Sequence, residues 1–461
     1  MVRLFNHWFA SSTLLQIAFD AILLFLSVVL AAAVLNRGDV FSVETVVPDA
    51  LLFAISMVIL NTVVGLYQRN PGRTMAQTTA RIVLSLMLAV PVAWAIFSFL
   101  PHGEAWNDAL RLVVPLAFVT LVAIRGVATL SGLTPMLVRK TLVLGTGAEA
   151  VAVEKSLSEL GPAVRFVGFF PAKKHESAQH VAVHKVLNNQ TDLVEVARRH
   201  ALDEIVVAVR ERRGGVLPLR ELLDCKLMGV RVLDLSSYYE RALGQIRLDT
   251  LHASWLIFGD GFRQGLLRSF VKRMFDIASA MVLLLLALPV MLLAGAMIAM
   301  ESGFPVLYRQ ERVGRGGRLF NLIKFRSMRT DAEVDGKPRW AVSNDSRVTR
   351  VGRAIRKLRI DELPQLLNVL TGEMSLVGPR PERPYFVDQL ANEIPFYAVR
   401  HSVKPGITGW AQVRYHYAAT LDDAAHKLQY DLYYVKNHTL FLDIVILFET
   451  VGVVVSGEGA H

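Results

Sequence analysis

Residues 353–384 read RAIRKLRIDELPQLLNVLTGEMSLVGPRPERP, and two adjacent carboxylates, Asp361 and Glu362, lie near the middle of this stretch. The acid pair is open to two interpretations. Asp361 can cap a helix that begins here, with Glu362 and Pro364 in the first turn, where proline is tolerated and acids complement the helix dipole. Alternatively the pair is catalytic. Successive helix residues point about 100° apart, so the two carboxylates would then have different tasks.

The charges around the acid pair favour a site for a phosphorylated ligand. Basic residues precede the pair, and Arg380 and Arg383 follow it in a proline-rich segment. Guanidinium groups bind phosphate through paired hydrogen bonds, and the prolines restrict the loop, so little entropy is lost on binding. We therefore expect one carboxylate to attack a substrate while the other holds a metal ion. The preceding basic residues are Arg353, Arg356, Lys357 and Arg359.

The first third of the chain predicts membrane helices. Hydrophobic residues make up 53% of the 461 residues, and the mean hydropathy is +0.39, which exceeds ordinary globular usage. Basic residues follow the second and fourth apolar runs and acids follow the first and third, so the positive-inside rule predicts cytoplasmic termini. No cleavable signal is expected, because the first run is too long. The runs are residues 14–35, 46–67, 80–100 and 110–130, each close to the roughly 20 residues needed to cross hydrocarbon.

Two charged residues and one cysteine are isolated in apolar segments. Asp20 and Arg125 lie inside the apolar runs, where a charge can mark a functional site. Both lie near the end of a run, so we expect their side chains to reach the membrane interface. The single cysteine, Cys225, excludes an internal disulfide and a multi-cysteine metal site, and we expect it to be buried and inert.

Residues 138–235 predict an α/β domain, because short apolar strands alternate with helical segments as in a doubly wound parallel sheet. Gly145, Gly147 and Ala150 form a GxGxxA turn after the first strand, the geometry of a pyrophosphate-binding turn. The acid expected after the second strand is missing from residues 165–174. We therefore expect a Rossmann-like module with a structural or regulatory role rather than a cofactor site.

A fifth apolar run, residues 271–302, opens the last part of the chain. Pro289 lies within it, where proline removes a backbone hydrogen bond and kinks a helix. Both flanks are basic, which favours entry and exit on the same membrane face. We predict a helix-break-helix hairpin in one leaflet; the alternative is a kinked ordinary span. The flanking residues are Arg268, Lys272, Arg273, Arg309, Arg312, Arg315 and Arg318.

Four segments together resemble a known family. They are KFRSM (324–328), LRIDELPQLLNVLTGEMSLVGPRPERP (358–384), KPGITGWAQV (404–413) and YDLYYVKN (430–437). They resemble the bacterial sugar transferase family, the monotopic polyprenyl-phosphate phosphoglycosyl transferases, over about 268–461. The preceding apolar runs and α/β region resemble its large members, which include undecaprenyl-phosphate glucose and galactose phosphotransferases. The layout also resembles the branch associated with exosortase-linked exopolysaccharide clusters.

The resemblance implies a fold and a reaction. It implies a mainly helical cytoplasmic catalytic domain, anchored by a re-entrant membrane helix broken at Leu288 and Pro289, although the family more usually has a small polar residue before that proline. Asp361 matches the nucleophile. It would attack the sugar-bearing phosphate of a UDP-sugar, form a covalent phosphosugar and release UMP. Polyprenyl phosphate would then accept the phosphosugar, which predicts ping-pong kinetics.

The resemblance also implies roles for other residues. Glu362 matches the magnesium-binding glutamate, so Mg2+ is the expected cofactor. Arg380 matches a Pro-Arg-Pro loop that contacts the nucleotide-sugar, and Asp431 matches a further acidic member of the site. The substrate-binding set is Lys324, Arg326, Arg356, Arg380, Arg383 and Asp431.

We therefore predict three domains: four transmembrane helices in 1–135, a Rossmann-like domain and linker in 136–265, and a catalytic domain in 266–461 with its re-entrant helix at 271–300. The expected location is the bacterial inner membrane. The expected partners are UDP-sugar, polyprenyl phosphate and membrane lipids, and the large members suggest a homodimer. The net charge of +10 is compatible with nucleic acid, but the densest basic segment, 308–329, follows an apolar run. Lipid headgroups and phosphorylated substrates are therefore the expected anions, and no nucleic acid is expected.

Two other classes of function stay open. One is a catalytically inactive membrane scaffold or nucleotide-sensing regulator of polysaccharide export, against which the intact acid pair argues. The other is a transporter, but the apolar runs contain no convergent set of charges. Residues 439–455 predict either an amphipathic helix at the interface or a buried packing helix.

Overall fold

A computed structural model shows two compact units. One comprises Met1–Val2 and Trp8–Leu243, and the other Arg3–His7 and Gly244–His461. The structure describes residues 2–4, 7–9, 11–35, 43–67, 75–98, 103–130, 138–160, 164–172, 180–187, 192–209, 217–251, 265–329, 347–415 and 420–456. Residues 252–264 of the predicted linker lie outside these ranges.

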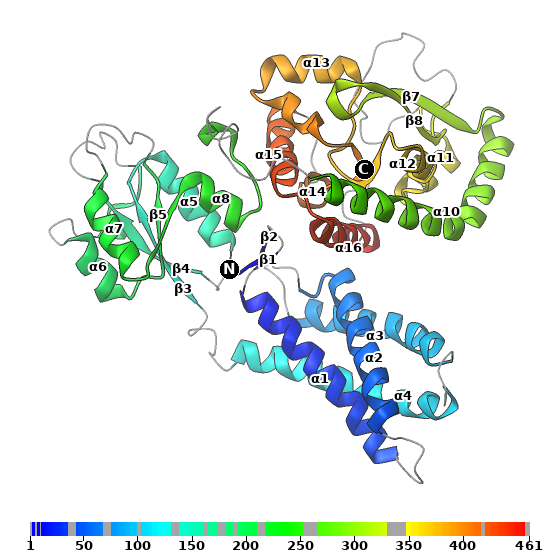
Figure 1. Ribbon diagram of the computed structural model, residues 1–461, viewed down its shortest axis with the longest axis horizontal. Coiled ribbons are helices and arrows are strands. Elements are labelled where there is room, and N and C mark those ends of the chain that lie inside the picture. The colour runs from blue at the N-terminus through cyan, green and yellow to red at the C-terminus, as the bar shows by residue number, and fades with distance from the viewer. Residues whose placement is uncertain are drawn as a thin grey trace. The chain divides into compact units, whose positions relative to one another are not determined.

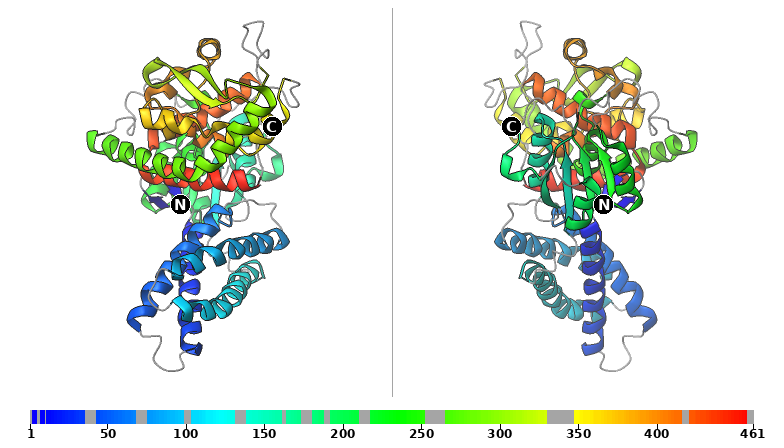
Figure 2. Two further views of the ribbon diagram at one scale, coloured as in Figure 1. Left: turned by 90° about the vertical axis from the view of Figure 1, so that its right-hand side faces the viewer. Right: turned by 90° about the vertical axis from the view of Figure 1, so that its left-hand side faces the viewer.

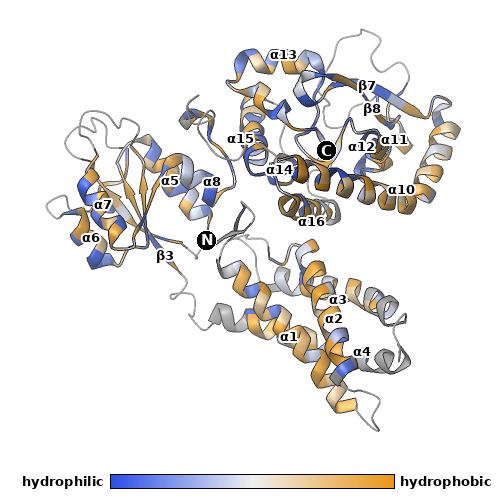
Figure 3. Ribbon diagram, viewed as in Figure 1, coloured by the Kyte–Doolittle hydropathy of each residue, from blue (hydrophilic) through white to orange (hydrophobic). Residues whose placement is uncertain are grey.

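Four apolar helices open the first unit (Figures 1 and 2, blue to cyan) and share one hydrophobic core. Two contain a stretch long and apolar enough to cross a membrane, Thr13–Leu35 and Val46–Val63, and the third contains a shorter one, Thr78–Pro91. Figure 3 shows apolar residues along these helices, and many of them are exposed outside the core. The helices are α1 (Ser11–Leu35), α2 (Val43–Val63), α3 (Met75–Ser98) and α4 (Gly103–Leu130).

Asp20 and Arg125 form a buried ion pair between α1 and α4. Arg125 donates to both carboxylate oxygens of Asp20, at 2.7 and 2.6 Å, and Tyr67 donates to one of them at 2.9 Å. Asp20 is fully buried, and Arg125 is 7% exposed. The prediction that these side chains reach the interface is therefore wrong. Their charges neutralise each other inside the helix bundle, which avoids exposing either one to hydrocarbon.

The α/β region forms a four-stranded parallel sheet in the order β4-β3-β5-β6. Helices α5 and α8 cover one face, and α6 and α7 cover the other (Figure 1). Cys225 lies buried in α7, as expected, and burial raises the pKa of its thiol to about 11, which makes it inert. The elements are β3 (Arg139–Leu144), α5 (Ala148–Glu159), β4 (Val164–Phe170), α6 (Leu193–His200), β5 (Glu204–Val207), α7 (Leu219–Leu227), β6 (Arg231–Asp234) and α8 (Leu235–Ala242).

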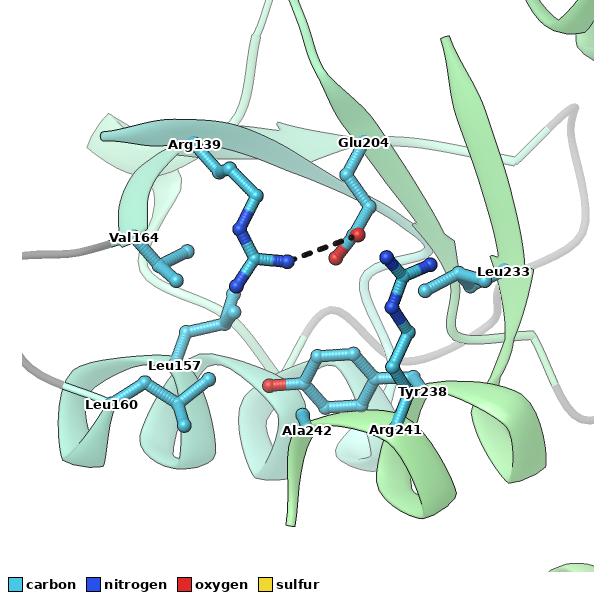
Figure 4. A pocket seen from close by; sticks show the side chains of 9 residues that line it. All are labelled: Arg139, Leu157, Leu160, Val164, Glu204, Leu233, Tyr238, Arg241 and Ala242. Carbon is cyan, nitrogen blue, oxygen red and sulfur yellow. Dashed lines mark ion pairs between the residues drawn. The ribbon is translucent and has the colours of Figure 1, made fainter. Parts of the chain in front are cut away.

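A small cavity lies at the amino ends of the strands, between the sheet and helices α5 and α8 (Figure 4). Glu204 is buried in it and lies 3.6 Å from Arg139 and 3.4 Å from Arg231. The cavity has a volume of about 10 Å³, which is room for about one water molecule. Nucleotides in doubly wound sheets bind at the opposite, carboxyl edge. The cavity is therefore a buried ion-pair cluster and not a nucleotide site.

The second unit is mainly helical and has one large core. Its strands are few and short: a β7–β8 hairpin with Leu307 opposite Phe325, and a parallel pair of β9 and β10. Its elements are α10 (Leu266–Ser302), β7 (Leu307–Val313), β8 (Leu319–Phe325), α11 (Arg350–Lys357), α12 (Gln365–Thr371), β9 (Ser375–Val377), α13 (Pro384–Glu393), β10 (Gly406–Thr408), α14 (Trp410–Arg414), α15 (Leu421–Asn437) and α16 (Leu440–Ser456).

Helix α10 is continuous through Leu288 and Pro289, so the helical interruption predicted there is not seen. The helix instead bends along its length (Figure 1). A proline inside a helix removes one hydrogen bond and produces a kink without ending the helix. Leu285 and Leu286, just before the proline, are more than 70% exposed.

Both ends of α10 are bonded to the same domain. Near its beginning, Arg273 donates to the carbonyls of Val369 and Leu370 at the end of α12. At its end, Glu301 accepts hydrogen bonds from the first main-chain amides of α11. Helix α16, by contrast, packs inward with Leu442 and Ile446 fully buried, which favours the packing alternative for residues 439–455.

Candidate active site

The acid pair lies in a 3₁₀ turn, Ile360–Glu362, between α11 and α12. The turn follows Arg359, whose φ of 56° is in the left-handed region that non-glycine residues rarely adopt. Helix α12 begins after Pro364, and no side chain caps its first turn. Asp361 is therefore not a helix cap, and the capping interpretation fails for this residue.

Asp361 is a buried carboxylate without a hydrogen-bond donor among the described residues. It is 9% exposed. Burial raises the pKa of Asp361 to about 6, and the charge of Glu362 acts in the same direction, whereas Lys324, Arg356 and Arg380 oppose the shift. A desolvated carboxylate without donors is a better nucleophile than a solvated one.

Glu362 has the opposite environment. Arg380 donates to its Oε1 at 2.7 Å, and Arg359 lies 3.8 Å from the same atom. Burial alone would raise the pKa of Glu362, but the charges of Arg380, Arg359 and Lys324 outweigh it and lower the pKa. Glu362 therefore stays ionised at neutral pH, whereas the pKa of Asp361, about 6, lies close to neutral pH.

Lys324 supplies a cation from β8. Its ammonium lies 5.4 Å from the centre of the Tyr308 ring, on the opposing residue of β7. Burial, and then the charge of Arg312, lower the pKa of Lys324 to about 8. The negative charge of Asp361 acts in the opposite direction and raises it. Lys324 forms no hydrogen bond or ion pair with a described residue, so its donors are available to a ligand.

The GPRPERP loop is held by a contact between two motifs: it follows β9 directly, and the KPGITG segment contains β10. Gly378 donates to Thr408 O at 2.9 Å, and Gly406 donates to Pro379 O at 3.0 Å. A Cβ atom on Gly406 would lie 2.1 Å from the Gly378 nitrogen. Only glycine permits this approach, which places Arg380 directly after a rigid backbone pair.

Arg400 supports the GPRPERP loop through its main chain. It donates to the main-chain oxygen of Arg380 at 2.8 Å and pairs with Asp431 at 2.8 Å. Both side chains are about 95% buried. Asp431, predicted as a member of the site, is therefore connected to Arg380 through Arg400 and positions the loop. Burial raises the pKa of Asp431 against the opposing effect of Arg400.

Arg312 of β7 supports the same loop by donating to Pro381 O at 3.0 Å. No sequence motif marks Arg312 or Arg400 as a site residue, because each acts on a main-chain carbonyl that is distant in the chain. Arg383, predicted to bind substrate, is half-buried directly before α13.

Arg326, predicted to bind substrate, bonds to the end of α10. One of its nitrogens donates to Ser302 O and Oγ and to Gly303 O, at 2.6–2.9 Å, so Arg326 caps the end of α10. Arg356 is half-buried on α11, and its charge acts on Asp361. The structure thus gathers Lys324, Arg356 and Arg380 around the acid pair.

Comparison with known proteins agrees with this geometry. Residues 267–457 match the family model described as bacterial sugar transferase. A UDP-N-acetylgalactosamine-undecaprenyl-phosphate N-acetylgalactosaminephosphotransferase from Aeromonas hydrophila is 46% identical over 242 residues, which cover 52% of this chain and 56% of that protein. An undecaprenyl-phosphate glucose phosphotransferase from Komagataeibacter xylinus is 33% identical over 383 residues, which cover 80% of this chain and 68% of that protein.

The chain thus spans between half and about two thirds of the length of these two relatives. The match to the second extends well beyond the catalytic unit. The apolar helices long enough to cross a membrane identify a membrane-associated protein. The chain belongs to the bacterial sugar transferase family.

Proposed function

We propose that the chain transfers a sugar 1-phosphate from a UDP-sugar to undecaprenyl phosphate, the initiating step of a lipid-linked glycan such as an exopolysaccharide. The observation that carries this proposal is the contrast within the acid pair: Asp361 is buried and without donors, beside a Glu362 held by Arg380. The names of the relatives support the donor and the acceptor.

In the first step an oxygen of Asp361 attacks the phosphorus that bears the sugar. The bond between that phosphorus and the oxygen bridging the two phosphates breaks, and UMP leaves with this oxygen. The negative charge of the diphosphate must be neutralised for a carboxylate to approach it. Lys324 and Arg380 supply positive charge on the donor side, and Arg356 supplies it beside Asp361.

In the second step a phosphate oxygen of undecaprenyl phosphate attacks the same phosphorus. The acyl-phosphate bond to Asp361 breaks, which regenerates the carboxylate and leaves a polyprenyl diphosphate sugar. The acceptor tail stays in the bilayer, so the site must work at headgroup depth. The bonding of both ends of α10 to one domain supports a helix that enters and leaves the same, cytoplasmic face of the inner membrane.

Mg2+ fits the acid pair. Mg2+ is usually held by one or two carboxylates together with substrate phosphate oxygens and water. The described residues contain no cluster of three or more potential ligands, so the donor diphosphate would complete the coordination. Glu362 would hold the ion, which when bound supplies charge neutralisation at the phosphates. Arg380 donates a hydrogen bond to Oε1 of Glu362. Binding of Mg2+ and the UDP-sugar would therefore change the hydrogen bonds of Arg380.

The remaining parts of the chain have supporting roles in this proposal. Helices α1 to α4 form a transmembrane domain, and the parallel α/β sheet forms a Rossmann-like cytoplasmic domain. Asp20 and Arg125 form hydrogen bonds to each other through both carboxylate oxygens, so their charges are already compensated. This argues against a transport pathway through these residues. A homodimer stays a prediction, as does the absence of a nucleic-acid partner.

Nucleotide release from the purified chain in lipid nanodiscs tests the proposal. The assay would contain Mg2+ and a panel of UDP-sugars, with and without undecaprenyl phosphate. We expect sustained UMP release that depends on the lipid for one sugar and is lost in Asp361→Asn. Release of UDP would instead mean transfer of the sugar without its phosphate. No turnover with any donor would favour the inactive scaffold or regulator.

A further inference from the structure

A second group of cations gathers at the beginning of α10. Arg273 of α10 and Lys404, just before β10, both lie over Gly372, the residue that ends α12. An ideal Cβ atom on Gly372 would lie 3.2 Å from Arg273 Nη2 and 3.6 Å from Lys404 Nζ. The two nitrogens are therefore within about 7 Å of each other, a separation at which like charges repel appreciably in a partly buried setting.

Lys404 has no anionic partner in the described part of the chain. It is half-buried and forms no hydrogen bond or ion pair with a described residue. Burial lowers the pKa of Lys404, and the charges of Arg273 and Arg315 lower it further, while Asp276 acts against them. Arg273 donates to two main-chain carbonyls and retains further N–H donors.

The carboxylates of this region are engaged elsewhere. Asp276 is 3% exposed and accepts a hydrogen bond from the Leu376 amide at 3.3 Å. Asp443 is fully buried and pairs with Lys272 at 2.7 Å. Glu373, beside Gly372, accepts hydrogen bonds from Asn368 and Thr371. Among the described residues no carboxylate forms an ion pair with Arg273 or Lys404, so the two cations are available to an anion.

The surroundings are those of a membrane interface. Leu266, Leu267 and Phe270, in the first turns of α10, are 92%, 77% and 62% exposed. Arg268 lies among them, and Arg315 is in the turn between β7 and β8; both are exposed. Interleaved apolar and basic side chains are typical of surfaces that insert among acyl chains and attract anionic headgroups.

We propose that Arg273 and Lys404 together bind the headgroup phosphate of an anionic phospholipid at the point where α10 enters the bilayer. This site rests on the membrane role proposed above for α10. One phosphate contacting both nitrogens replaces their mutual repulsion with two charge-assisted hydrogen bonds. The adjacent apolar residues of α10 then contact the acyl chains of the same lipid layer.

Phosphatidylglycerol binding to the detergent-purified full chain, followed by native mass spectrometry, tests the site. We expect Lys404→Met to weaken the tightest binding event on the order of fivefold, the effect of one basic residue near a lipid surface. Lys404→Arg keeps the charge and should bind as the wild type does, and so should Lys155→Met, which removes an exposed lysine of α5. Equal affinities of wild type and Lys404→Met would overturn the proposal.

Competition with inorganic phosphate distinguishes a site specific for a lipid headgroup from one that binds any phosphate. We expect millimolar phosphate to leave phosphatidylglycerol bound, and displacement would overturn lipid docking. UMP release measured on the same preparations keeps the two proposals distinct. Lys404-dependent lipid binding without UMP release would refute only the proposed reaction. UMP release with unchanged lipid binding in Lys404→Met would refute only the headgroup site.

Discussion

Asp361 and Glu362 are adjacent in the chain but differ in their electrostatic environment. Asp361 is desolvated and has no donor among the described residues, so its proton is released near pH 6. Glu362 is paired with Arg380 and stays ionised at lower pH. In the proposed reaction this difference favours attack by Asp361 and binding of a cation by Glu362, the division expected when the pKa values of two titratable neighbours are shifted in opposite directions.

The pH dependence of kcat/KM follows from two of these groups. Below about pH 6 Asp361 becomes protonated and cannot attack, and above about pH 8 Lys324 loses the charge that binds the donor. We therefore expect a bell-shaped profile with limbs near these values, since kcat/KM reports the free enzyme. Lys324→Arg should remove the alkaline limb and preserve the acidic one, because guanidinium stays charged. An alkaline limb unchanged in Lys324→Arg would contradict this assignment.

The acid pair, Lys324, Arg356 and Arg380 were predictable from the sequence, because each lies in a motif whose chemistry is local. Arg400 and Arg312 were not, because each acts on a main-chain carbonyl of the loop from another element. The contact made by Arg326 was not predictable for a related reason. Arg326 is adjacent to residues of a functional motif, but its side chain bonds to the end of α10.

At the scale of the element, α10 combines a membrane-compatible composition with two attachments to one domain. A straight helix of 37 residues would be about 55 Å long, more than a hydrocarbon core requires. Its bend and its bonded ends are compatible with two ends on the same membrane face.

Cysteine labelling tests the topology of α10. Gly265 is exposed directly before the helix, and Phe304, just after its end, is 82% exposed. In a Cys225→Ser background, Gly265→Cys and Phe304→Cys should both react with a membrane-impermeant maleimide in inside-out membrane vesicles. Neither should react from the outer face of intact spheroplasts. Labelling of the two positions from opposite sides would establish an ordinary span and contradict the re-entrant arrangement.

The parallel pairing of β9 and β10 explains why both strands are flanked by glycine. Segments 358–384 and 404–413 are both family motifs by resemblance, and the structure gives their glycines a common reason. Gly378 and Gly406 are in direct backbone contact. The pairing of segments nearly 30 residues apart depends on tertiary packing and has no local signature.

At the scale of the whole molecule, the described chain separates into units with independent cores. The helical class and the α/β region were predictable from periodicity. The partner of Asp20 was not, because Arg125 is 105 residues away and hydropathy does not encode which charges meet. The extreme N-terminus was also not anticipated: His7 is buried in the catalytic unit and bonds Tyr433 at 2.8 Å.

The buried pair makes a specific prediction about stability. Arg125→Leu should leave Asp20 as an unpaired buried charge and destabilise the protein by about 3–5 kcal/mol. The double variant Asp20→Leu, Arg125→Leu should recover much of this loss, because it removes both charges. Unfolding in detergent measures the effect, with Arg111→Leu, exposed on α4, as the matched control. A single variant as stable as the wild type would mean that the pair contributes nothing.

The most direct test of the account is the covalent state of Asp361. The full chain in nanodiscs would be mixed with its UDP-sugar and Mg2+ without undecaprenyl phosphate, quenched, and examined by intact-protein and peptide mass spectrometry. We expect one equivalent of UMP and one phosphosugar on the peptide containing Asp361, lost on addition of the lipid acceptor and never formed in Asp361→Asn. UMP formation that requires the acceptor, with no adduct at any time, would contradict the covalent mechanism.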